Sequence, residues 1–123
     1  MGIKVDVTSN RKLIEQASNE AIERALTAIG MQVEGYAVDE LNRSKLHADG
    51  SIRPNVDTGR LRASITHDVR PSEQAVYVGT PVEYAAYVEM GTSRSRPYPY
   101  LKPAVMNHVD EYRDMAEQFL KNS

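Results

Sequence analysis

The feature that most constrains the fold is a pair of short segments with strand periodicity, separated by a turn. Residues 65–70 alternate between positions suited to a core and polar positions, and residues 75–78 are apolar or aromatic. Alternation with a period of two is typical of a half-buried strand. Residues 71–74 (Pro-Ser-Glu-Gln) have the composition of a turn. The pattern therefore predicts an antiparallel hairpin that ends at Gly79.

The N-terminal part of the chain predicts one more strand and a long helix. Residues 3–7 alternate in the same way, so we expect a sheet of three or four strands. Residues 8–10 suit a helix cap, and a helix is expected over residues 10–43. Its apolar stripe is Ile14, Ala17, Ala21, Ala25, Ile29, Val33, Ala37 and Leu41. Because steps of four wind around a straight helix, we expect a bend at Gly30 or Gly35, or contact of the outer turns with another subunit.

Two further helices are expected after the hairpin. Thr80 is a good N-cap, Pro81 suits the first helical position, and Glu83 completes a capping box. Gly91 predicts a left-handed cap at the end of this helix. A last helix starts near Pro103 and buries one face. That face carries Val105, Met106, Val109, Tyr112, Ala116, Phe119 and Leu120.

The connection between the long helix and the hairpin has two parts. Residues 44–56 show no sustained period, which predicts a loop that is flexible or bound to a partner. Asp57 or Thr58 is expected to cap a short helical turn that contains Leu61, with Gly59 fixing the turn. The chain as a whole predicts one α+β domain over residues 1–123. In it, a small antiparallel sheet packs against a long N-terminal helix and a C-terminal helix.

Composition and charge limit the function. The net charge of −2 lacks the basic excess of a dedicated nucleic-acid binder, and the absence of cysteine excludes disulfides and thiolate sites. No apolar run is long enough to span a membrane, and the N-terminus lacks a signal peptide's apolar block. The charged side chains of residues 13–42 are acidic except for Arg24, and those of residues 91–102 are all basic. Both segments fit solvated surfaces, but they could also meet on neighbouring copies in a head-to-tail ring.

No set of residues predicts catalysis. His47, His67 and His108 are widely separated and belong to no metal-ligand pair. Ser64 and His67 point to opposite faces of a strand, and Glu83 and Glu89 do not share a helix face. We therefore expect no enzyme activity, no cofactor and no metal; a hydrolase is a distant alternative.

Three motifs resemble one family in the order expected for it. They are residues 57–65 (DTGRLRASI), 78–92 (VGTPVEYAAYVEMGT) and 96–104 (RPYPYLKPA). Together they resemble the tailed-phage tail-component or neck family typified by gene product ten of phage HK-ninety-seven. The resemblance spans residues 56–104, and its departures are mild: Tyr100 replaces the usual Phe and Lys102 the usual Arg.

The resemblance implies a structural virion protein made in the bacterial host cytoplasm. It implies a tail-completion or head–tail joining subunit that forms a hexameric ring around the DNA channel. The implied partners are further copies, the connector or adaptor, the tail terminator and the tail tube, with genomic DNA passing without sequence recognition and no membrane contact. The alternative is a small nucleic-acid-binding module that stacks bases on tyrosines beside an arginine loop.

Candidate site residues follow from these expectations. Candidates for assembly contacts are Arg60, Arg62, Tyr84, Tyr87, Glu89, Arg94, Arg96, Tyr98, Tyr100 and Leu101. Candidates for structural turns and caps are Asp57, Gly59, Thr80, Glu83, Gly91 and Pro103.

Overall fold

A computed structural model gives the arrangement of most of the chain. It describes residues 1–42, 44–46, 52–54, 59–82, 85–91, 93 and 99–121. Among the helices of this described part, none is long and apolar enough to cross a membrane.

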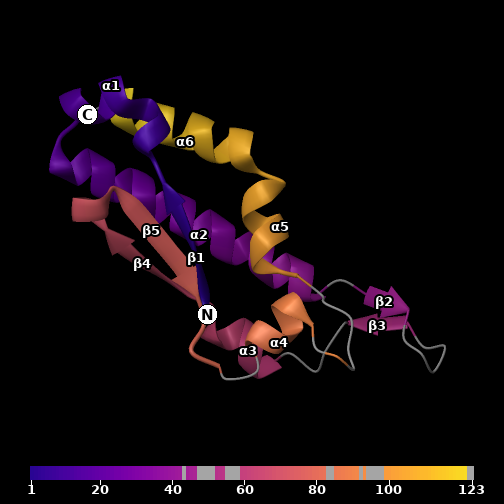
Figure 1. Cartoon of the computed structure of the whole chain (residues 1–123). Helices are drawn as coiled ribbons and strands as arrows, with labels where there is room; N and C mark the ends of the chain where they lie inside the picture. The colour runs from indigo at the N-terminus through magenta and orange to yellow at the C-terminus, as the bar shows by residue number, and fades with distance from the viewer. Residues whose placement is uncertain are drawn as a thin grey trace.

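A three-stranded antiparallel sheet is the platform of the fold. β5 (Ala75–Gly79) lies in the centre, between β1 (Gly2–Asp6) and β4 (Thr66–Arg70) (Figure 1). The predicted hairpin and the predicted N-terminal strand are both confirmed. The register places Val5 and Val69 on either side of Val76. One face of the sheet is therefore apolar, as the alternation in the sequence requires.

The hairpin turn is tight and uses a left-handed residue. A single 3-10 turn, η2 (Pro71–Glu73), is followed by Gln74 with a φ of 53°. The Gln74 carbonyl then accepts the backbone N–H of Val7 at 3.1 Å. The turn thus joins the start of β5 to the end of β1, and the predicted turn over residues 71–74 is confirmed.

The predicted long helix is two helices. After a 3-10 turn, η1 (Thr8–Asn10), α1 (Arg11–Gln16) ends where Ala17 becomes extended, and α2 (Asn19–Asn42) follows. The Ser18 hydroxyl accepts the backbone N–H of Ala21 at 3.1 Å, so Ser18 caps α2. The expectation of a bend at Gly30 or Gly35 was wrong, because α2 continues through both and the interruption lies at Ala17.

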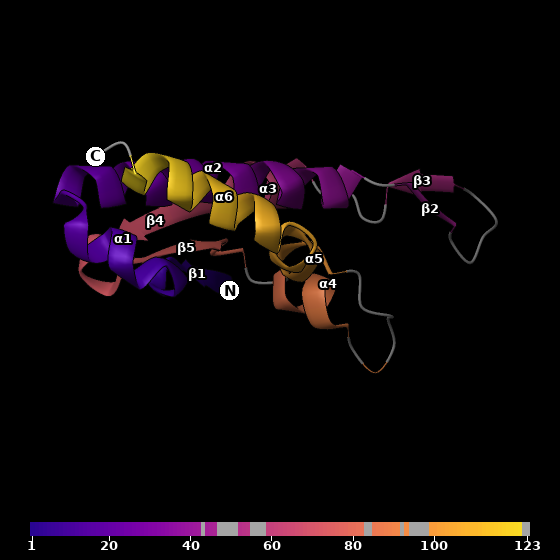
Figure 2. The same cartoon turned by 90° about the horizontal axis from the view of Figure 1, so that it is seen from above.

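The winding apolar stripe of α2 is covered within one subunit. α2 contacts β4 and β5 on one side and α5 (Leu101–Met106) and α6 (Val109–Lys121) on the other. Figure 1 shows α6 above α2 and the strands below it, and Figure 2 shows α6 crossing in front of α2. The buried residues of α2 are Ala21, Ile22, Ala25, Leu26, Ile29, Gly30, Val33, Ala37 and Leu41. Contact with another subunit is therefore not needed to explain the stripe.

Gly30 packs closely against the sheet. A Cβ atom added there would lie 2.9 Å from Cγ2 of Val76 and 3.0 Å from Cβ of His67. At Gly35, the same addition would meet nothing within 4 Å. The first glycine is thus a packing contact rather than a hinge.

The C-terminal region also has more breaks than predicted. One last helix was expected, but Asn107 and His108 interrupt it between α5 and α6. The Asn107 N–H still donates to the Pro103 carbonyl at 3.1 Å, so the chain turns there without unwinding fully. Pro103 lies inside α5, and the residue that precedes this helix is Tyr100.

The short helices agree in part with the sequence. α3 (Gly59–Ser64) contains buried Leu61, as predicted. α4 (Ala85–Met90) starts later than the expected Pro81, although Thr80 Oγ1 accepts the N–H of Val82 at 3.1 Å. Gly91 has a φ of 75° and its N–H donates to the Tyr87 carbonyl, which confirms the left-handed cap.

The segment predicted as a loop contains a small hairpin. β2 (Ser44–Leu46) pairs antiparallel with β3 (Ile52–Pro54). Both views show this pair extending away from the main sheet and the helices (Figures 1 and 2). The prediction of irregular structure was wrong for these six residues, because two three-residue strands are too short to show a period in the sequence.

Candidate assembly surfaces

A buried carboxylate joins α4 to α5. Glu89 is only 7% exposed, and its Oε1 accepts the backbone N–H groups of Tyr100 at 3.0 Å and Leu101 at 2.8 Å. Its Oε2 accepts the N–H of Lys102 at 3.2 Å. The first N–H groups of a helix have no partner within it, so Glu89 caps α5 from another helix. The Tyr100 hydroxyl adds a bond to the Ala85 carbonyl at 3.3 Å.

Three predicted assembly residues therefore lie inside the subunit. Glu89, Tyr100 and Leu101 are all buried. The tyrosines expected to stack nucleic-acid bases in the alternative function were Tyr84, Tyr87, Tyr98 and Tyr100, and of these Tyr100 is fully buried and has no exposed ring. No local pattern predicts the Glu89 bonds, because they join residues 11 to 13 positions apart.

An apolar groove lies beside this junction. We name it the methionine groove; it has a volume of about 580 Å³ and lies between β1, α4 and α5. It is lined by Met1, Gly2, Ile3, Glu89, Met90, Pro99, Leu101, Lys102 and Met106. Met90 is 65% exposed and Met106 is 57% exposed. Methionine is flexible and polarisable, which suits a surface that adapts to a partner.

A second groove lies between the first half of α2 and the end of α6. We name it the glutamate groove; its volume is about 470 Å³. It is lined by Glu20, Glu23, Arg24, Thr27, Ala28, Met31 and Phe119. Among these lining residues Met31 is 59% exposed, and Glu20, Glu23 and Arg24 carry charge.

The exposed apolar side chains gather at these two grooves. In the described residues, the large hydrophobic side chains that stay exposed are Met1, Met31, Tyr87, Met90, Met106, Val109 and Phe119. All but Tyr87 and Val109 line one of the grooves. Tyr87 lies three residues before Met90 in α4, on the neighbouring turn, whereas Val109 is the first residue of α6, after the break that follows Met106. Tyr87, a predicted assembly residue, thus extends the methionine groove.

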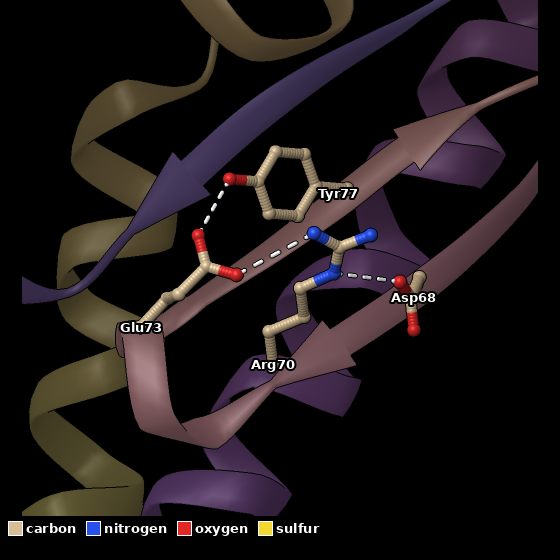
Figure 3. Close-up of polar contacts among 4 residues, drawn as sticks. All are labelled: Asp68, Arg70, Glu73 and Tyr77. Atoms are coloured by element: carbon tan, nitrogen blue, oxygen red, sulfur yellow. Dashed lines mark hydrogen bonds and ion pairs between the residues drawn. The ribbon is translucent and has the colours of Figure 1, made fainter.

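The outer face of the sheet is polar and internally paired. Figure 3 shows the Tyr77 hydroxyl donating to Oε1 of Glu73 at 2.8 Å, and Arg70 reaching both Asp68 and Glu73. The Arg70 guanidinium also lies 4.5 Å from the centre of the Tyr77 ring. The hydrogen bond from Tyr77 lowers the pKa of Glu73 and raises the pKa of Tyr77. These charges satisfy one another, so the face offers no unpaired group among the four residues.

The two histidines that the structure describes, His67 and His108, have structural partners. His67 Nδ1 lies 2.7 Å from Oε1 of Glu34. The ring of His108 stacks on Tyr36 with centres 3.5 Å apart, while the Tyr36 hydroxyl donates to Glu111 at 2.6 Å and its pKa is raised by that bond. In the part of the chain that the structure describes, no three histidine, aspartate or glutamate side chains form a metal site.

Ser64 and Thr80 close the base of the hairpin. Their hydroxyl oxygens are 2.5 Å apart, and the Ser64 hydroxyl also donates to the Leu61 carbonyl at 2.7 Å. Ser64 is the last residue of α3 and β4 begins only at Thr66, so the expectation that Ser64 and His67 lie in one strand was wrong.

The remaining candidates divide into exposed residues and residues beyond the description. Arg60 and Arg62 are exposed on α3, and Arg62 Nη1 donates to Oδ1 of Asn42. Gly59 is the first residue of α3. Asp57, Glu83, Tyr84, Arg94, Arg96 and Tyr98 lie outside the described residues, as does His47.

A comparison with protein families gives one further observation. The model of a family described as "Bacteriophage HK97-gp10, putative tail-component" matches residues 6–91. The match begins at the end of β1 and includes α2, the hairpin and α4, while α5 and α6 follow it. No curated protein and no solved structure matches the chain.

Proposed function

Because the chain belongs to the HK97-gp10-like family of phage tail components, we propose that it completes the tail or joins it to the head as one subunit of a hexameric ring. The ring surrounds the DNA channel. Its other partners are the neighbouring connector or adaptor, the tail terminator and the tail tube. The observation that carries the proposal is the gathering of exposed apolar side chains at two separate grooves.

Two apolar surfaces favour a role in assembly. When a partner covers a large hydrophobic side chain that is more than half exposed, the complex is stabilised by about 25 cal/mol for each Å² of apolar surface removed from water. Met31, Met90 and Met106 meet that description. Contiguous apolar patches rimmed by polar residues are typical of interaction sites.

The small hairpin supports assembly by a second route. An isolated two-stranded hairpin is at best marginally stable in water. β2 and β3 extend away from the main sheet and helices, so we propose that a neighbouring protein in the particle covers them.

The charge of the chain suits a channel through which DNA slides. The net charge is −2, and Arg70 on the outer sheet face is already paired with Asp68 and Glu73. Tight binding of DNA needs many unpaired cations, whose contribution falls steeply with salt. We therefore propose passage of DNA without sequence recognition.

The role is structural rather than enzymatic in this proposal. The titratable side chains of the two grooves are carboxylates and cations at their rims, and Glu89 is occupied by three backbone N–H groups. No nucleophile with an adjacent base lines either groove.

Light scattering of the purified chain, combined with detection of the chain in purified particles, tests this function. We expect a closed oligomer in solution and the same chain in the particle. A stable monomer that never enters particles would contradict the proposal. Affinity for DNA that falls steeply with salt would favour the nucleic-acid-binding alternative instead.

A further inference from the structure

We propose that the methionine groove of one copy binds the glutamate groove of the next, so that copies join head to tail. The inference rests on the proposed function and identifies the surfaces that would build the ring. It commits each groove to one occupant, the other groove of a second copy of this chain.

The two grooves are built from separate parts of the fold. The methionine groove is formed by β1, α4 and α5, and the glutamate groove by the first half of α2 and the end of α6. They share no residue. One copy can therefore use both at once, which is what a ring or filament of identical subunits requires.

Apolar side chains supply the matching centres. Met90 and Met106 stand exposed at the first groove, and Met31 and Phe119 at the second. An interface between one groove of each kind covers all four of these side chains. The expected centre is apolar and rich in methionine and aromatic side chains, as in the cores of known interfaces.

Charge selects the pairing of unlike grooves. Lys102 is a cation among the described residues that line the methionine groove, and the carboxylate beside it, Glu89, is buried under backbone N–H groups. Glu20 and Glu23 outnumber Arg24 at the glutamate groove. Pairing of two like grooves would place Lys102 near Lys102, or glutamates near glutamates. Pairing of unlike grooves places Lys102 near glutamates, and like-charge contacts are what exclude the other arrangements.

Engineered thiols test this geometry, because the chain has no cysteine of its own. We would make Met31→Cys, Met106→Cys and the double variant, and treat each with a short bis-maleimide. Both methionines are more than half exposed, so the subunit should fold in every case. A chain with one thiol can join only two copies. The double variant should give a ladder of covalent species that reaches the size of the complete ring.

A matched control places the second thiol elsewhere. Met31→Cys combined with Ser72→Cys, an exposed residue of the hairpin turn, should give no species beyond a dimer. An equal ladder from this control would overturn the proposal. An oligomer seen by light scattering without a ladder from the double variant would also overturn it, while leaving the ring itself intact. A monomer that is absent from particles would instead contradict the proposed function.

Charge reversal provides an independent readout. Glu23→Lys should weaken association of the subunits about tenfold, and addition of Lys102→Glu should restore most of it. The Lys102 substitution leaves its backbone N–H free to bond Glu89. Failure of the double reversal to recover any association, with both single variants folded, would contradict the pairing.

Discussion

The backbone N–H of Leu101 lies 2.8 Å from Oε1 of Glu89, a residue twelve positions earlier in the chain. The same carboxylate accepts the N–H groups of Tyr100 and Lys102. Glu89 thereby fixes the start of α5 against α4. Met90 and Met106 project from these two helices, so the shape of the methionine groove depends on this buried side chain.

Glu89→Ala should destabilise the subunit by about 3 kcal/mol, because it leaves N–H groups at the buried start of α5 without an acceptor. Glu89→Gln should cost less, since an amide oxygen can still accept. Urea unfolding followed by circular dichroism measures both. Glu117→Ala removes a carboxylate whose partner, Lys121, is on the surface, and it should leave the midpoint unchanged. Equal midpoints for Glu89→Ala and wild type would contradict the structural role.

Gly30→Ala and Gly35→Ala should change stability in opposite directions. Both gain helix propensity of up to about 1 kcal/mol. At Gly30 the new methyl group meets Val76 and His67 at 2.9 Å and 3.0 Å, and overpacking should give a net loss of about 1–2 kcal/mol. At Gly35 the space is open, so the variant should be more stable than wild type. Thermal unfolding of the two variants side by side decides this, and a stabilised Gly30→Ala would show that α2 lies farther from the sheet.

Tyr112 should make the fold sensitive to alkaline pH. Burial raises the pKa of Tyr112 above its ordinary value of 10.0. Above pH 10 the unfolded chain releases this proton and the folded chain keeps it, so stability falls as pH rises, by at most about 1.4 kcal/mol for each pH unit. Below pH 10 this contribution is fully present.

Tyr112→Phe tests the assignment. The variant loses the hydrogen bond from the hydroxyl to the Ala104 carbonyl, which should cost about 1 kcal/mol near neutral pH. The difference in the free energy of unfolding between this variant and wild type should become smaller above pH 10, because only wild type loses stability through the ionisation of Tyr112 in the unfolded chain. Urea unfolding between pH 7 and pH 11, at about half-unit steps, measures this. Tyr87→Phe, on an exposed surface, is the control. A difference in the free energy of unfolding between Tyr112→Phe and wild type that stays constant from pH 7 to pH 11 would contradict the prediction.

Charge reversal at Arg94 and Arg96 should impair assembly more than folding. The sequence predicts a loop for these two arginines, which lie outside the described residues; charges in a loop contribute little to the stability of a subunit, whereas charges at an interface steer association. The double variant should keep the melting temperature of wild type and lose oligomer in light scattering. A large fall in melting temperature would show instead that these arginines hold the subunit together.

The local sequence pattern was sufficient to predict the antiparallel hairpin and the cap at Gly91. The alternation around Val69 and Val76 fixed the hairpin, and Gly91 marked a left-handed cap, because each signal depends on a few neighbouring residues. Ser18 carried a cap signal that was overlooked within a longer apolar stripe, although its hydroxyl accepts the N–H of Ala21. The break at His108 also lay within a continuous apolar pattern.

Contacts between distant residues were beyond local pattern. The tight packing at Gly30 could not be predicted, because its neighbours Val76 and His67 are far away in the sequence. The burial of Glu89, a candidate for assembly contacts, could not be predicted either, because a glutamate in a helix is usually solvated, whereas here it meets N–H groups of another helix. The grooves likewise depend on which methionines remain uncovered after packing, and that is decided by the tertiary fold.

Cryo-electron microscopy of intact particles tests the central claim most directly. The account predicts a ring of identical copies of this chain at the head–tail interface or the tail end, in which Met106 of each copy faces Met31 of the next. Absence of the chain from the particle, or its presence only as separate copies without contact, would contradict the account.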